Sequence, residues 1–126
     1  MKEIIATEKA PGAIGPYVQA VKVNGIVYCS GQLGIDMETG VLAETVEAQA
    51  HCAMKNIGAI LEAAGMGYGN VVKTTIFLAD TADFASVNQV YASYFGESYP
   101  ARSCVQAAAL PKGGKVEIEC IACDVK

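Results

Sequence analysis

The sequence lacks residue types on which many hydrolytic and nucleotide-binding sites depend. Its 126 residues include no tryptophan and a single histidine, His51. A Ser-His-Asp or Cys-His set would have to use His51, which lies in a stretch with helical periodicity and is more typical of a helix surface. The glycines of GMGYG (residues 65–69) follow a predicted helix and precede a predicted strand, the reverse of a dinucleotide-binding motif. Both classes of site are therefore disfavoured.

Neither a basic cluster nor a long apolar run is present. The nine Lys and Arg residues are scattered and the net charge is −4, which argues against a protein that binds duplexes by neutralising phosphates. Residues 1–12 contain no apolar stretch of the kind found in secretory signals, and no run approaches the length of about 18 residues that a spanning helix needs. We expect a soluble, cytoplasmic protein without a membrane partner; a nucleic-acid partner is disfavoured, although weak or single-stranded binding stays open.

The cysteines favour packing over metal binding. An odd number without a framework spacing fits a reducing compartment. Cys120 and Cys123 form a C-x-x-C motif, but they lie in a strand pattern, where positions three apart point to opposite faces. One ion cannot take both thiolates, so we expect no metal and interpret the cysteines as small buried hydrophobes. The five are Cys29, Cys52, Cys104, Cys120 and Cys123.

The periodicity predicts two helices and five main strands. The predicted helices cover residues 43–64, ended by Gly65, and 84–95. The predicted strands cover residues 17–23, 26–34, 71–79, 103–110 and 116–125, with a short extra strand near residues 4–6. Asn24-Gly25 joins the first two main strands and is a strong hairpin signal.

The order β-β-α-β-α-β-β indicates a single α+β domain over residues 1–126. The strand–helix–strand step requires parallel strands and a right-handed crossover, and we expect an antiparallel hairpin at each end. Both helices then cover one face of a mixed sheet. The other face needs a cover, and 52% of the residues are apolar, so we expect a homo-oligomer.

Two residues of YPARSCVQ (residues 99–106) are candidates for chemistry. Arg102 follows Pro100 at the entrance of a predicted strand, and its guanidinium can hold a carboxylate through two parallel bonds. On chemistry alone, a surface or interface salt bridge explains it slightly better. Cys104 lies on the same strand face, with no His or Lys placed to make a thiolate, so an inert thiol is favoured.

Three further places could carry polar chemistry. Glu117 and Glu119 share one face of a predicted strand, which is either a solvated face or a place where one carboxylate activates water. Tyr17 begins a strand and either packs or presents its hydroxyl to a site. Gly31, between Ser30 and Gln32, interrupts a strand pattern, as at a bulge or a close approach to a ligand.

The whole chain resembles one known family. The segments IATEKAPGAIGPYVQAV, SGQLG, NIGAILEAAG, VVKTTIFLAD, DFASVNQVY and YPARSCVQAAALPKGGKVEIE match the Rid/YjgF family of reactive-intermediate (enamine/imine) deaminases in order and spacing. The most specific part is P-A-R-S-x-V followed by V-E-I. Tyr17, Arg102, Cys104 and Glu117 stand where the RidA branch has its active-site residues.

The resemblance implies a chorismate-mutase-like α+β fold and a homotrimer with clefts between subunits. It also implies hydrolysis of 2-imino acids to 2-keto acids and ammonia, with no metal or cofactor. The imines derive from enamines that pyridoxal-phosphate-dependent dehydratases release from serine or threonine.

The chemistry of a 2-imino acid fits these residues. Arg102 would hold the carboxylate, Glu117 would activate a water, and Tyr17 would donate or relay a proton. Gly31 and Cys104 would offer backbone groups. We add Ser30, Phe84 and Asn88 to the expected substrate-binding residues.

One geometric argument points to a shared site. A last hairpin centred at residues 112–113 would place Arg102 opposite Cys123 and Glu117 opposite Ala108, roughly 20 Å apart along the strands. One substrate cannot reach both, so either the strand bends or shifts register near residues 107–110, or the two residues come from different chains, which is what we expect. Three alternatives stay open: a module that binds keto or amino acids without turnover, an RNA-acting or translation-inhibitor protein, and a chaperone that uses apolar surface.

Overall fold

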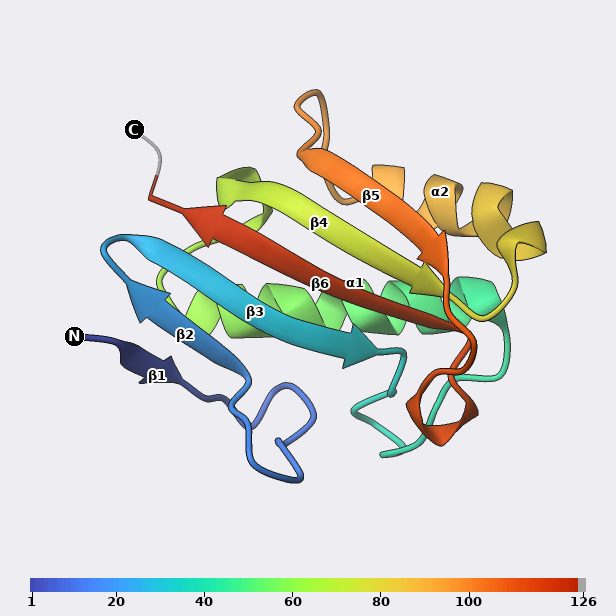
Figure 1. Cartoon of the computed structure of the whole chain (residues 1–126), viewed down its shortest axis with the longest axis horizontal. Helices are drawn as coiled ribbons and strands as arrows, with labels where there is room; N and C mark the ends of the chain where they lie inside the picture. Colours follow the sequence, from blue (N-terminus) through green and yellow to red (C-terminus); the bar gives the residue numbers. More distant parts are fainter. Residues whose placement is uncertain (125–126) are drawn as a thin grey trace.

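The computed structural model describes residues 1–124, which form one sheet and two helices (Figure 1). The sheet has the strand order β1-β2-β3-β6-β4-β5. The strands are β1 (Glu3–Ile5), β2 (Ala20–Val23), β3 (Ile26–Leu33), β4 (Val71–Leu78), β5 (Ala101–Gln106) and β6 (Val116–Cys123). The helices are α1 (Val46–Ala63) and α2 (Phe84–Ala92), and short 3-10 turns η1 (Tyr68–Asn70), η2 (Thr81–Asp83) and η3 (Pro111–Gly113) lie between elements.

Strand β6 occupies the middle of the sheet. It pairs antiparallel with β3 on one side and with β4 on the other. Strands β3 and β4 therefore run in the same direction, as the predicted crossover through α1 requires. Strand β5 pairs in parallel with β4 at the sheet edge, after the second crossover through α2.

The expected hairpin between the last two strands is wrong. Strand β5 ends at Gln106, and residues 107–115 carry the chain from the sheet edge to its centre, where β6 inserts between two strands (Figure 1). Insertion satisfies both backbone edges of β6, whereas a hairpin with β5 would leave one edge unpaired.

Strand β2 also begins later than expected, at Ala20, because Tyr17 lies in a turn in which its N–H donates to the Gly15 carbonyl. Val125, the predicted last strand residue, lies outside the described residues.

The local turn and cap signals are confirmed. Asn24 and Gly25 have φ angles of 51° and 75°, which the tight β2–β3 turn requires. Helix α1 begins at the cap Thr45, whose side chain accepts from the N–H of Ala48 at 3.1 Å. It ends at Gly65 with φ 78°, and the next N–H donates to the Leu61 carbonyl at 2.8 Å.

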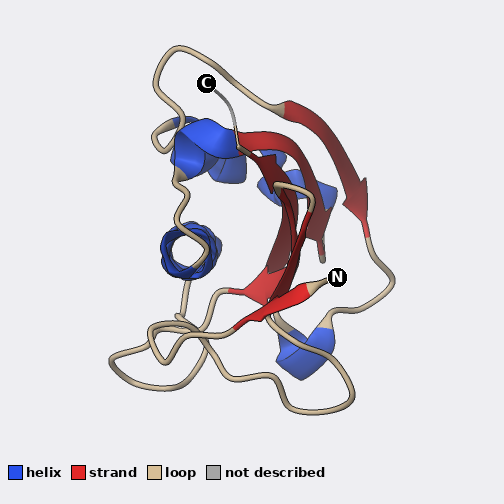
Figure 2. Ribbon diagram, turned by 90° about the vertical axis from the view of Figure 1, so that its left-hand side faces the viewer, coloured by secondary structure: helices blue, strands red, loops and turns tan. Residues whose placement is uncertain are grey.

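Both helices cover one face of the sheet, as expected. Figure 2 shows α1 end-on along the concave side of the curved sheet, where Ala53, Ile57 and Ile60 are at most 1% exposed. Helix α2 packs beside α1 and buries Val87. Neither of these helices covers the opposite face. Over the described residues no helix is both long and apolar enough to cross a membrane.

We expect Gly34→Ala to destabilise this packing. An added methyl at Gly34 would overlap the Cα and Cβ of Gln49 in the first turn of α1, and overpacking of this kind costs about 1–3 kcal/mol. Urea unfolding should show a lowered midpoint. Gly67→Ala is the matched control, because no atom lies within 4 Å of its added methyl. Equal midpoints for the two variants would contradict the close approach of α1 to β3.

Candidate functional site

Glu117 owes its position to the alternation of β6. Val116 and Ile118 are fully buried toward the helices, so Glu117 between them points to the face that the helices leave open. Its register partners are Leu33 on β3 and Phe77 on β4. Partial burial, and secondly the negative charge of Glu119, raise the pKa of the Glu117 carboxyl above its ordinary value. A carboxylate with a raised pKa is a better proton acceptor.

Gly31 makes room for this carboxylate. The register between β3 and β6 shifts between Cys29 and Gln32, which confirms the predicted irregularity at Gly31. A side chain there would begin 2.8 Å from Oε2 of Glu117. Neighbouring Ser30 is held in place, since its hydroxyl donates to the Val18 carbonyl at 2.7 Å.

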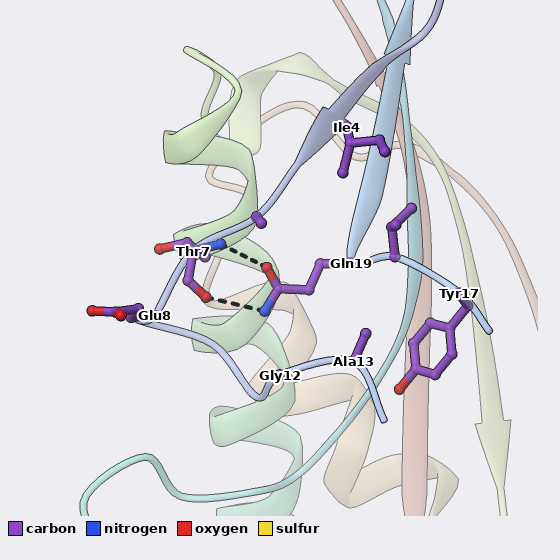
Figure 3. A pocket seen from close by; sticks show the side chains of 9 residues that line it. Ile4, Thr7, Glu8, Gly12, Ala13, Tyr17 and Gln19 are labelled. Carbon is purple, nitrogen blue, oxygen red and sulfur yellow. Dashed lines mark hydrogen bonds between the residues drawn. The ribbon is translucent and has the colours of Figure 1, made fainter. Parts of the chain in front are cut away.

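Tyr17 lines the same cavity as Gly31 and Glu117. The cavity has a volume of about 560 Å³, and Tyr17, Gly31 and Glu117 line it together with Lys112 of η3. Lys112 adopts a left-handed conformation with φ 60°. A second cavity of about 330 Å³ lies against Tyr17 on the side of the N-terminal segment, where it is lined by Ile4, Thr7 and Gln19 among others (Figure 3).

Arg102 belongs to a different place, between β5 and α2. Its Nη1 donates to Oδ1 of Asn88 at 2.6 Å. The guanidinium carbon lies 5.5 Å from the ring centre of Phe84 and 5.1 Å from that of Tyr91, distances suited to cation–π attraction. Among residues 1–124, Arg102 forms no ion pair with a carboxylate. Within residues 1–124, a surface salt bridge therefore does not explain this arginine.

A cavity of about 340 Å³ opens in front of the guanidinium. It is lined by Asn88, Tyr91, Ala92, Tyr99, Pro100 and Arg102. The arginine therefore has one fixed polar partner, two aromatic neighbours and an open side. Such a guanidinium is available to a carboxylate ligand.

Cys104 lies on the same side of β5 as Arg102. Its register partner is Ile76, which is fully buried toward the helices. Burial raises the pKa of the Cys104 thiol, and the positive charge of Arg102 opposes this to a smaller extent. The thiol therefore stays protonated at neutral pH, which agrees with its expected inertness.

The expected site residues thus form two groups on opposite faces of the sheet. Arg102 pairs with Thr74, which is 1% exposed and faces the helices, whereas Glu117 points to the open face. Their Cα atoms are two strands and three residues apart, on the order of 14 Å. The expected separation of about 20 Å along a hairpin was wrong. One chain nevertheless fails to bring the two groups together, because the sheet lies between them.

Tyr91 and Gln19 are two residues near the cavities that were not predicted from the sequence as site residues. Tyr91 follows Phe84 by seven residues and Asn88 by three, a spacing that places all three on one face of α2, so helical periodicity could have found it. Gln19 gave no such signal, because its partners are backbone groups.

The structure brings no metal-binding cluster together in the part of the chain that it describes. No three His, Cys, Asp or Glu side chains gather there. Cys120 is buried and Cys123 is half-buried on one continuous strand, so their side chains point to opposite faces, as predicted. All five cysteines are free thiols.

Comparison with known proteins identifies the family. A family model described as endoribonuclease L-PSP matches residues 7–124. The chain is 57% identical over 122 residues to "Reactive Intermediate Deaminase A, chloroplastic" of Arabidopsis thaliana, covering 96% of this chain and 65% of that protein. It is 53% identical over 125 residues to "2-iminobutanoate/2-iminopropanoate deaminase" of Salmonella typhimurium, covering 97% of this chain and 98% of that protein.

A solved structure agrees with these relatives. The crystal structure of Escherichia coli TdcF with bound serine superimposes with a TM-score of 0.94 at 47% identity, covering 98% of this chain and 99% of that chain. The match extends over almost the entire fold. The chain therefore belongs to the endoribonuclease L-PSP family, which is the Rid/YjgF family that its sequence resembles.

Proposed function

We infer that this chain is a 2-iminobutanoate/2-iminopropanoate deaminase, which hydrolyses reactive 2-imino acids to 2-keto acids and ammonia. Relatives that are 52–56% identical over nearly the whole chain carry this activity in their names. The observation in the structure that supports it best is the guanidinium of Arg102, which faces a cavity without an ion-pair partner in residues 1–124. It is placed to receive the carboxylate of an imino acid.

The proposed first step is capture of the carboxylate by Arg102. Asn88 fixes one side of the guanidinium at 2.6 Å, and the rings of Phe84 and Tyr91 restrict its rotation. Pre-organisation of this kind lowers the entropy lost when two parallel hydrogen bonds form. The related TdcF was crystallised with serine, which also carries a carboxylate beside its Cα.

The proposed second step is attack of water on the C=N carbon. Glu117 accepts a proton while the water oxygen bonds to that carbon and an electron pair moves to nitrogen. The proton then passes to nitrogen, directly or through Tyr17. The hydroxyl on that carbon then gives its own proton to nitrogen as the C–N bond breaks, so that ammonia leaves and the hydroxyl oxygen becomes the keto oxygen. Backbone groups of Gly31 and Cys104, with Ser30 beside them, complete the proposed site.

We propose that two subunits of a homotrimer contribute to each site, and that residues 1–126 act as one domain. The two groups of residues lie on opposite faces of the sheet, so a neighbouring chain has to supply one of them. The open face also carries exposed apolar side chains, including Tyr28 and Val105, each 48% exposed. Five free thiols fit a reducing compartment, and the cytoplasm is the location that we propose.

Mixed oligomers test the shared site. Arg102→Ala and Glu117→Gln should each be inactive alone. When the two variants are co-expressed and assemble at random, about a quarter of the sites combine an intact Arg102 with an intact Glu117 from the neighbour. Keto-acid formation, coupled to a threonine dehydratase, should recover to about that fraction of wild type. Mixed oligomers as inactive as the parents would show that each site uses one chain.

Separate variants distinguish an enzyme from a binding module. Arg102→Lys keeps the charge but loses the planar fork, so kcat/KM and binding of 2-oxobutanoate should both fall, on the order of 100-fold for kcat/KM. Glu117→Gln should still bind 2-oxobutanoate in calorimetry while kcat falls by about 100-fold or more. A wild-type protein that binds the keto acid without accelerating imine hydrolysis would instead be a binding module.

The acid limb of the pH profile should report on Glu117. Because the base works only when unprotonated and its pKa is raised, activity should fall on acidification at a pH above the ordinary value for a glutamate. Glu119 raises this pKa, so Glu119→Gln should shift the limb to lower pH. Glu97→Gln, an exposed charge change after α2, is the control and should leave it unchanged. A limb that Glu119→Gln does not move would argue against Glu117 as the base.

A further inference from the structure

The side chain of Gln19 is buried and makes an unusual number of hydrogen bonds to backbone. It is 5% exposed. Its Oε1 accepts from the N–H of Thr7 at 2.7 Å, and its Nε2 donates to the carbonyls of Thr7 at 3.1 Å and Pro11 at 2.8 Å. The carbonyl of Ala10 lies at 3.4 Å from the same nitrogen. Figure 3 shows the amide placed against Thr7.

These hydrogen bonds give the segment between β1 and β2 the backbone partners that strand pairing would otherwise supply. Residues 6–18 form no helix or strand, and Ala10 is the one buried side chain among them. Backbone polar groups near the core need partners, and this segment obtains them from the amide of Gln19. The amide of Gln19 and the buried methyl group of Ala10 therefore hold the chain between β1 and residue 12, together with an exposed ion pair from Lys9 to Glu62 at 3.7 Å.

Gln19 also closes the loop that carries Tyr17. At the beginning of this loop its Nε2 holds the Pro11 carbonyl. At the end its own carbonyl accepts from the N–H of Ser30 at 2.9 Å. Gln19 thus contributes to both ends of residues 12–18, and the Ser30 hydroxyl also holds the Val18 carbonyl at the later end, which reduces the conformational freedom of the loop.

The loop forms a wall of the cavity that contains Glu117. Pro11, Gly12, Ile14 and Tyr17 line that cavity, and Gly12 and Tyr17 also line the smaller cavity beside Gln19 (Figure 3). Tyr17 is 52% exposed and Ile14 is 80% exposed, so little packing of their own holds them. Their positions depend on how the ends of the loop are anchored.

We propose that Gln19 is a positioning residue for the deaminase site: by anchoring Thr7 and Pro11, its amide sets the position of Tyr17 at the cavity that Glu117 also lines. This inference rests on the proposed function. Gln19 touches no substrate in this account and acts through Tyr17 alone. The hydrogen bonds, rather than the bulk of the side chain, carry the effect.

The kinetic test replaces the amide by a side chain of similar length. Gln19→Met should lower kcat on the order of tenfold, because small misplacement of a reacting group is costly, while KM changes less since Arg102 is unaffected. Gln19→Glu retains the acceptor for Thr7 but loses the donors to Pro11, and should lose kcat similarly. It serves as the second variant if Gln19→Met does not fold. Wild-type kcat in a folded variant would overturn the proposal.

Asn70→Leu is the matched structural control. Its amide also ties two segments, accepting from the N–H of Gly67 and donating to the Cys123 carbonyl, each at 3.0 Å. It lines neither cavity beside Tyr17. Asn70→Leu should lower the unfolding midpoint while kcat stays at the wild-type value. A comparable fall in kcat for Asn70→Leu would show that loss of stability alone explains the Gln19 variants.

A double-mutant cycle tests whether Gln19 acts through Tyr17. If it does, Gln19→Met should cost much less in kcat on the background of Tyr17→Phe than on that of wild type. Fully additive losses would overturn the proposal. A wild type that fails to accelerate imine hydrolysis would refute the proposed function instead, so the two failures are distinguishable.

The absence of tryptophan permits a direct spectroscopic measurement. Ile14→Trp introduces a single tryptophan into the exposed loop. Its steady-state anisotropy should fall when Gln19→Met is added, and should not fall when Asn70→Leu is added. Unchanged anisotropy with Gln19→Met would show that the amide does not anchor the loop, whatever the protein catalyses.

Discussion

The insertion of β6 between β3 and β4 is the constraint on which the rest of the structure depends. Its register determines which face each of its side chains takes, and Val116 and Ile118, both fully buried, hold that register. A slip by one residue would expose this buried set and drive Glu117 into the core without a partner. The apolar residues that stabilise the sheet therefore also keep the carboxylate at the open face, beside Gly31.

The features that the sequence predicts well are local. The hairpin at Asn24-Gly25, the end of α1 at Gly65 and the alternation along β6 each depend on neighbouring residues, so their patterns survive in a single sequence. By contrast, neighbouring residues do not decide which strand pairs with β5. Pro111 and the glycines after it look like a hairpin turn, but a strand with two unpaired edges gains more backbone hydrogen bonds between β3 and β4 than beside β5. Choosing between these pairings requires the whole sheet.

The candidate site likewise has a part that local sequence patterns predict and a part that depends on the pairing of distant strands. The strand period places Arg102 with Cys104, and the helical period of α2 places Phe84 with Asn88. Neither period relates one of these groups to Glu117, which depends on the global pairing. The contacts of Gln19 are even harder to predict, since its partners are backbone carbonyls and a backbone N–H, which do not depend on the type of side chain. No side-chain pattern could reveal that contact, and only the path of the chain does.

The separation of the two groups has an electrostatic consequence. A guanidinium and a carboxylate on the same face, within about 4 Å, would form an ion pair that lowers the pKa of the acid and occupies the donors of the arginine. With the sheet between them, Arg102 keeps an open side and burial can raise the pKa of Glu117. In the reaction that we propose, a substrate carboxylate would meet a cation without a competing anion from the same chain, and water would meet a base whose pKa is raised. Within one chain, the sheet thus keeps both groups in the states that the proposed imine hydrolysis would use. If a second subunit brings them to one site, as we propose, the substrate lies between them, with its carboxylate on Arg102 and its C=N carbon toward Glu117.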